Sequence, residues 1–223
     1  MNKYYTIKKI TLLFIVIILS NNIISQNSEE AVKLLNKVSE NIKSYDNIYI
    51  NYTYTLFNLE EDINQINKGS FVTEDDKWKF VMLDVTRIFD GDKLYTISPD
   101  DEEVTISTQN PDDESTITPN KMLYFYEEGY NFEMDIVQYV GRKKIQYVKL
   151  IPMDSDAEIK YILMGIDVEF NQIYKVIETG INDTQTTIAI IDFEVNLPLE
   201  ESLFVFDEEK YFEELNYYEN IID

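Results

Sequence analysis

Residues 48–57 alternate with a period of two, which is the spacing of a β-strand, and this alternation constrains the fold more than any other feature. Similar signals recur along the chain between turns rich in Asp, Gly and Pro. We expect strands at residues 48–57, 65–73, 77–83, 85–89, 93–98, 102–108, 132–140, 143–151, 158–168, 172–179, 184–193 and 202–206. Short connections predict antiparallel pairing, and this many strands predict one large curved sheet or barrel.

Two segments predict helices. Residues 27–45 place Ala31, Leu34, Leu35, Val38 and Ile42 on one face at helical spacing, and Asn27 can cap the start. Residues 121–128 follow a Thr-Pro-Asn helix-opening signal and are apolar over much of their circumference. This short second helix could therefore plug the curved sheet.

The first twenty-five residues predict a secretory signal peptide. Three lysines precede an uncharged run at residues 10–19, and a short polar exit ends at Ser25. A membrane-spanning helix needs about 20 apolar residues, so this run is too short to stay in a bilayer. Cleavage after Ser25 would leave residues 26–223 as one exported domain. The alternative is an uncleaved anchor, because Ile23 and Ile24 extend the apolar stretch.

Composition excludes several classes of function. The chain has 42 acidic against 19 basic residues, a net charge of −23, and neither cysteine nor histidine. The acidic balance argues against nucleic acid, which requires clustered Lys and Arg, and against standing attachment to anionic lipid. Without His or Cys, no imidazole or thiolate can act as catalyst or metal ligand. We expect no cofactor and no metal, and we expect a monomer.

The order of these elements resembles the LolA family of periplasmic outer-membrane lipoprotein carriers. The most similar piece is the hairpin of residues 89–99, which reads F-D-G-D-K-L-Y-T-I-S-P. Residues 34–54, 63–93 and the terminal L-F-V-F-D of residues 203–207 add to the resemblance. It extends over nearly all of residues 26–223, but it depends on a pattern and not on invariant catalytic residues.

The resemblance implies an unclosed, strongly curved antiparallel sheet with helices in its mouth and an apolar cavity for acyl chains. It also implies three partners: acylated lipoproteins, an inner-membrane transporter that releases them, and an outer-membrane acceptor.

One feature departs from the family. Characterised relatives carry a basic residue just after the strand that aligns with residues 69–72, whereas residues 73–76 here read T-E-D-D. That basic contact cannot be carried over, and the nearest bases are Lys68, Lys77 and Arg87.

A carrier must hide acyl chains from water, because each exposed methylene costs about 0.8 kcal/mol. Aromatic residues and Met suit such a lining, since Met fills irregular gaps and Tyr places a polar tip at a rim. The candidates for the lining are Tyr52, Tyr54, Leu56, Phe71, Trp78, Phe80, Met82, Phe89 and Tyr95, and those for the plug are Met122, Leu123, Phe125 and Tyr126. The same residues would equally suit the ordinary core of a β protein.

Other functions remain open at this point. The cargo could be another lipid or hydrophobic ligand. A hydrolase could use acid pairs at residues 100–103, 112–114 or 208–209, although solvated turns explain such runs more simply. Residues 154–158 resemble the start of a calcium loop, but the sixth position is Ile159 and the twelfth is Gly165. The open sheet edge could also pair with a partner strand.

Overall fold

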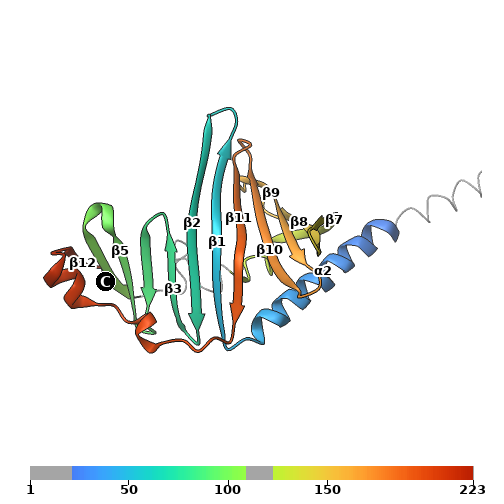
Figure 1. Cartoon of the computed structure of the whole chain (residues 1–223). Helices are drawn as coiled ribbons and strands as arrows, with labels where there is room; N and C mark the ends of the chain where they lie inside the picture. Colours follow the sequence, from blue (N-terminus) through green and yellow to red (C-terminus); the bar gives the residue numbers. More distant parts are fainter. Residues whose placement is uncertain (1–21, 109–122, 223) are drawn as a thin grey trace, which may run out of the picture.

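The computed structural model describes residues 22–108 and 123–222, which form one twisted, curved sheet crossed by a long helix (Figure 1). The strands in chain order are β1 (Asn47–Asn58), β2 (Ile63–Glu74), β3 (Lys77–Met82), β4 (Val85–Phe89), β5 (Lys93–Ser98), β6 (Glu103–Thr108), β7 (Tyr130–Val140), β8 (Lys143–Pro152), β9 (Ile159–Asp167), β10 (Gln172–Gly180), β11 (Gln185–Val195) and β12 (Tyr218–Ile222). Eleven of the expected strands are therefore confirmed to within a few residues.

The spatial order of the sheet is β12-β6-β5-β4-β3-β2-β1-β11-β10-β9-β8-β7. All neighbours pair antiparallel except β12, which lies parallel to β6. The sheet remains open because its two outer strands, β12 and β7, do not pair with each other. The unclosed antiparallel sheet that the family resemblance implies is thus confirmed, apart from the parallel pairing of β12.

The two halves of the chain meet in the middle of the sheet, where β1 pairs with β11. Asn47 fixes this junction with its side chain. Its amide donates to the Leu197 carbonyl oxygen at 2.9 Å, and its own oxygen accepts the Leu197 backbone N–H at 2.9 Å. Buried amide groups need such partners, so Asn47 stabilises the pairing of segments that are distant in sequence.

Helix α2 (Asn22–Lys43) lies against one face of the sheet and contacts β7 and β10. Ala31, Leu35, Val38 and Ile42 are buried along its inner stripe, as helical spacing predicts. The helix begins five residues before Asn27, so Asn27 lies inside it and does not cap it. Among the described residues, no helix is both long and apolar enough to cross a bilayer.

Buried side chains form two clusters on opposite faces of the sheet. The cavity-side cluster lies between α2, the segment beginning at Leu123, and strands β1–β3 and β8–β10. The outer cluster lies over β4–β6, where Ile88, Tyr95 and Ile97 pack against Phe206 of the C-terminal segment. Alternation within β5 explains the separation, because Leu94 faces the first cluster while Tyr95 faces the second.

The C-terminal segment differs from its prediction. Residues 202–206 are not a strand; a short 3-10 helix, η2 (Glu201–Phe204), precedes an extended stretch without ladder pairing. Phe204 and Phe206 are buried while Val205 is 62% exposed. This alternating burial comes from packing against a face of the sheet and not from pairing with another strand. The π-helix η3 (Glu209–Glu214) and strand β12 follow, and neither was predicted.

Two shorter segments connect the strands on either side of residues 109–122. A 3-10 turn, η1 (Pro99–Asp101), joins β5 to β6. The second expected helix, residues 121–128, is only partly described: Leu123 is helical, and residues 124–129 form turns and bends. Residues 121 and 122, and the expected polar loop at residues 109–116, lie outside the described residues. In the described part, the expected plug is therefore a turn segment and not a helix.

Candidate functional site

An apolar cavity of about 470 Å³ lies on the concave side of the sheet. Its lining comes from β1–β3 on one side and from β9–β11 on the other, with further residues from the segment that includes Leu123 and Phe125 and from Tyr130 at the start of β7. The lining residues are Ile50, Tyr52, Tyr54, Phe71, Phe80, Met82, Leu123, Phe125, Tyr130, Ile162, Ile173, Val176, Glu178, Ile188, Ile190 and Phe193. A volume of this size falls within the range of about 300–1,000 Å³ for small-molecule sites.

Curvature of the sheet makes the cavity possible. Strands β3 and β9 are five positions apart in the sheet, which is about 24 Å at the usual spacing of about 4.8 Å between strands. They border one cavity only because the sheet bends around it. Within β1, alternation directs Ile50, Tyr52 and Tyr54 to this concave face.

Tyr52 forms part of the floor of the cavity. Its hydroxyl donates to the Val81 carbonyl oxygen at 3.1 Å, and its ring stacks on Phe80 with centroids 6.3 Å apart. Burial raises the pKa of the Tyr52 phenol well above its usual value, since the phenolate would lose hydration. The ring lies directly over Gly69, where an added Cβ would come within 3.0 Å of it. A residue without a side chain is therefore required opposite this ring.

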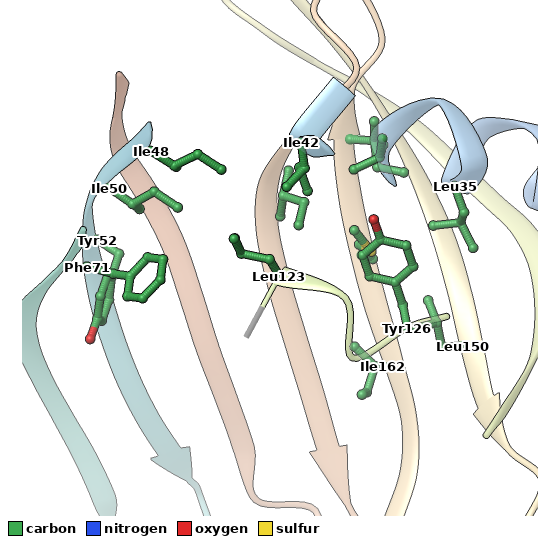
Figure 2. Close-up of a cluster of buried hydrophobic side chains, with 14 of the residues drawn as sticks. Leu35, Ile42, Ile48, Ile50, Tyr52, Phe71, Leu123, Tyr126, Leu150 and Ile162 are labelled. Atoms are coloured by element: carbon green, nitrogen blue, oxygen red, sulfur yellow. The ribbon is translucent and has the colours of Figure 1, made fainter. Parts of the chain in front are cut away.

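The covering segment, residues 123–129, borders the cavity through Leu123 and Phe125 and is held to α2 by polar contacts. Tyr126 and Ser39 share a hydrogen bond of 3.1 Å, and the Ser39 hydroxyl donates to Glu127 at 2.6 Å. Lys43 pairs with the same carboxylate at 3.1 Å. Figure 2 shows Tyr126 between the residues of α2 and those of the sheet, and Leu123 facing the open space toward Phe71.

These contacts shift two ionisation equilibria. Burial raises the pKa of Tyr126 to about 12. The hydrogen bond from Ser39, supported by Lys43, lowers the pKa of Glu127. The ionised Glu127 is thus the form that ties the covering segment to the helix.

Seven of the residues predicted to line or plug the cavity are brought together at it: Tyr52, Tyr54, Phe71, Phe80, Met82, Leu123 and Phe125. Trp78 and Phe89 lie nearby in the same cluster, where their rings stack with centroids 6.1 Å apart, but they do not reach the cavity. Leu56 lies on β1 beyond the last lining residue of that strand.

The remaining predicted residues lie elsewhere. Tyr126 is fully buried in the cluster beside the cavity and does not line it. Tyr95 is on the opposite face of the sheet, stacked on Phe206 with centroids 4.5 Å apart, because β5 alternation directs it away from the cavity. Met122 is outside the described residues.

Sequence patterns did not identify the wall of the cavity formed by β9–β11, which we call the far wall. The missed lining residues are Ile50, Tyr130, Ile162, Ile173, Val176, Glu178, Ile188, Ile190 and Phe193. Most of them alternate on β9–β11, and the pairing of β1 with β11 would have pointed to them. That pairing joins segments too far apart in sequence for local patterns to reveal it.

Within residues 22–108 and 123–222, no three Asp or Glu side chains gather closely enough to hold a metal ion. The calcium-like residues 154–158 form a turn, in which the Asp154 carboxylate accepts the backbone N–H of Asp156 at 2.9 Å. What the described residues form here is a cavity with an almost entirely apolar lining.

The fold and the cavity together define a class: an open, curved β-sheet that encloses an apolar space beneath a helix. This is the architecture that the resemblance to the LolA family predicts. No protein-family model and no curated protein matches the sequence.

Solved structures do match. An uncharacterized conserved protein from Thermus thermophilus shares the fold with a TM-score of 0.53 and 7% identity, over 86% of this chain and 98% of that chain. A LolA superfamily protein from Nitrosomonas europaea matches with a TM-score of 0.39 and 9% identity, over 79% and 98% of the two chains. The lipoprotein LppX from Mycobacterium tuberculosis gives 0.46 and 10%, over 77% and 98%. At these identities the likeness concerns the fold alone.

Proposed function

We propose that this protein is an exported carrier that binds the acyl chains of lipoproteins in its cavity and transfers them from the inner to the outer membrane. The observation that carries the proposal is the cavity itself, which is lined almost entirely by apolar and aromatic side chains. An open apolar space of this size is unusual in a close-packed interior, where voids larger than a water molecule are few. Acyl chains would fill it and bury their surface.

The covering segment supports a route of entry. It borders the cavity through Leu123 and Phe125, and a few polar contacts with α2 hold it. Such contacts contribute about 0.5–1.5 kcal/mol each, so displacement by a ligand that buries several methylene groups is energetically feasible. The basic start and short apolar run at residues 1–25 support export to the periplasm, with cleavage after Ser25. The transporter and the acceptor follow from the family resemblance.

Binding of a fluorescent acyl probe, together with mass spectrometry of lipid that copurifies, tests the proposal. Two adjacent residues on β11 provide a matched pair: Ile190 lines the cavity, and Ile191 is 53% exposed. We expect Ile190→Phe to weaken probe binding about tenfold or more, because the larger ring occupies ligand space. Ile191→Phe should bind the probe like the wild type.

Two results would contradict the proposal. One is an absence of both copurified lipid and probe binding. The other is equal loss of binding in the two variants. If a lipid other than a lipoprotein copurifies, the alternative of a carrier for another hydrophobic ligand is the better description.

A further inference from the structure

One charged side chain interrupts the cavity lining of the described residues: Glu178, on β10. Its neighbours in the lining are aliphatic, aromatic or sulfur-containing. The inference drawn from it depends on the proposed function, because it concerns the polar end of a ligand whose chain occupies the cavity.

Glu178 lies in the last row that β9–β11 contribute to the lining, near one end of the cavity, and Tyr130 on β7 lies one row further in the same direction. Across the sheet it pairs with Ile162 on β9 and with Thr186 on β11, which in turn pairs with Leu56. Thr186 and Leu56 do not line the cavity, whereas Val176, Ile188 and Tyr54, in the next row in the opposite direction, do. A chain lying along the cavity would therefore place its end group in the row of Glu178.

The Glu178 carboxylate has no partner of opposite charge in the described residues, and no hydrogen bond to it is found there. The nearby lysines of β8 and β9 are engaged elsewhere: Lys149 lies 4.8 Å from the Tyr161 ring centroid, and Lys160 pairs with Asp183. Burial raises the pKa of Glu178. Tyr130 faces it, and the carboxylate contributes, after burial, to raising the pKa of that phenol.

A half-buried carboxylate without a partner costs free energy, because the apolar surroundings replace water and offer no hydrogen bond in return. A ligand can supply the missing donor. An ammonium group would satisfy the carboxylate through charge-assisted hydrogen bonds, whereas a ligand carboxylate or phosphate would meet a like charge.

We propose that Glu178 receives the polar end of the bound amphiphile, and that this end is a positively charged ammonium group. The site is thereby selective for cationic over anionic head groups on chains of equal length. The cavity walls bind the chain, and Glu178 sets its direction.

Three twelve-carbon amphiphiles test this selectivity: dodecylammonium, dodecanol and dodecanoate, each below its micelle concentration. Their affinities are measured by displacement of N-phenyl-1-naphthylamine, a neutral apolar fluorophore, from the wild-type protein. Dodecylammonium should bind about tenfold more tightly than dodecanol, the effect expected of one charge-assisted hydrogen bond. Dodecanoate should bind most weakly.

Glu178→Gln should reduce the advantage of dodecylammonium to about twofold or less, since the amide keeps the shape and loses the charge. Glu194→Gln is the control. It removes the same charge from an exposed position on the neighbouring strand β11 and should keep the wild-type order of affinities.

The outcomes separate the two proposals. If all three amphiphiles bind the wild type equally, the cavity is a lipid site and the role of Glu178 is refuted. The same holds if both variants lose the preference together, because the net charge then explains it, or if neither does. If no amphiphile displaces the fluorophore, both the inference and the proposed function fail.

Discussion

The two faces of the sheet contain similar side chains but are covered differently. On the outer face, Phe206 stacks on Tyr95 with centroids 4.5 Å apart and on Tyr211 at 5.4 Å, so the C-terminal segment fills the surface over β4–β6. On the concave face, α2 and the segment beginning at Leu123 leave about 470 Å³ open. Aromatic content alone does not leave a cavity; how closely the covering segment packs on the sheet decides whether the surface is filled.

The largest expected effect on stability comes from a substitution on the outer face. Phe206→Ala should lower the free energy of unfolding by about 3–5 kcal/mol, because a ring in contact with three others is lost from a packed site. Acyl-probe affinity of the remaining folded protein should be unchanged. Phe80→Ala, on the cavity side, should lose less stability and alter probe binding, and urea unfolding with probe titration measures both. Equal effects of the two variants on binding would break the comparison.

Gly69→Ala tests the close packing of the cavity floor. The new methyl group would lie within 3.0 Å of the Tyr52 ring and of the Val81 carbonyl oxygen, so the ring and strand must shift. We expect a loss of about 1–3 kcal/mol in the free energy of unfolding. Probe affinity should fall as well, because the displaced ring belongs to the lining. Ser70→Ala, one residue along β2, adds no such contact and should stay within about 0.5 kcal/mol of the wild type.

A matched pair of enlargements compares the two faces directly. Val104 is fully buried in the outer cluster, whereas Val176 lines the cavity. Val104→Phe should lower the free energy of unfolding by about 1–3 kcal/mol through overpacking and leave the binding site intact. Val176→Phe should cost less than about 1 kcal/mol and weaken probe binding, since the ring enters empty space. Comparable destabilisation by both would show that the concave face is packed as tightly as the outer one.

The smallest effect concerns pH. The pKa of Glu127 is lowered in the folded state, so the ionised carboxylate stabilises the fold at pH values above its ordinary pKa of about 4.3. This contribution is lost as the pH falls through the lowered folded-state pKa. Ser39→Ala removes the main cause of the lowered pKa. The free energy of unfolding of this variant should therefore fall less steeply than that of the wild type as the pH drops from about 5 to about 3. Thermal unfolding across that range measures it, with Ser44→Ala, at an exposed position, as control.

Local patterns predicted the strands because alternation is a property of single segments. They placed β1 and β2 correctly, and with them the near wall through Tyr52 and Phe71. They failed for Tyr95, because β5 has buried residues on both faces, Leu94 on one and Tyr95 on the other, and alternation does not say which face borders the cavity. They failed for the far wall because β11 joins β1 through long-range pairing. The period-two burial of Phe204 and Phe206 imitated a strand without forming a ladder.

The pairing of β1 with β11 in the middle of the sheet affects how the protein folds. The Asn47 amide contacts Leu197, 150 residues further along the chain, so the two halves of the sheet can join only when nearly the whole polypeptide is present. Contacts of such separation slow folding, because a large loop must close before they form. Until β11 pairs with β1, one edge of β1 stays unpaired, and the wall of the cavity formed by β9–β11 is not joined to the wall formed by β1–β3. We therefore expect the cavity to form late in folding, when β11 pairs with β1 in the middle of the sheet.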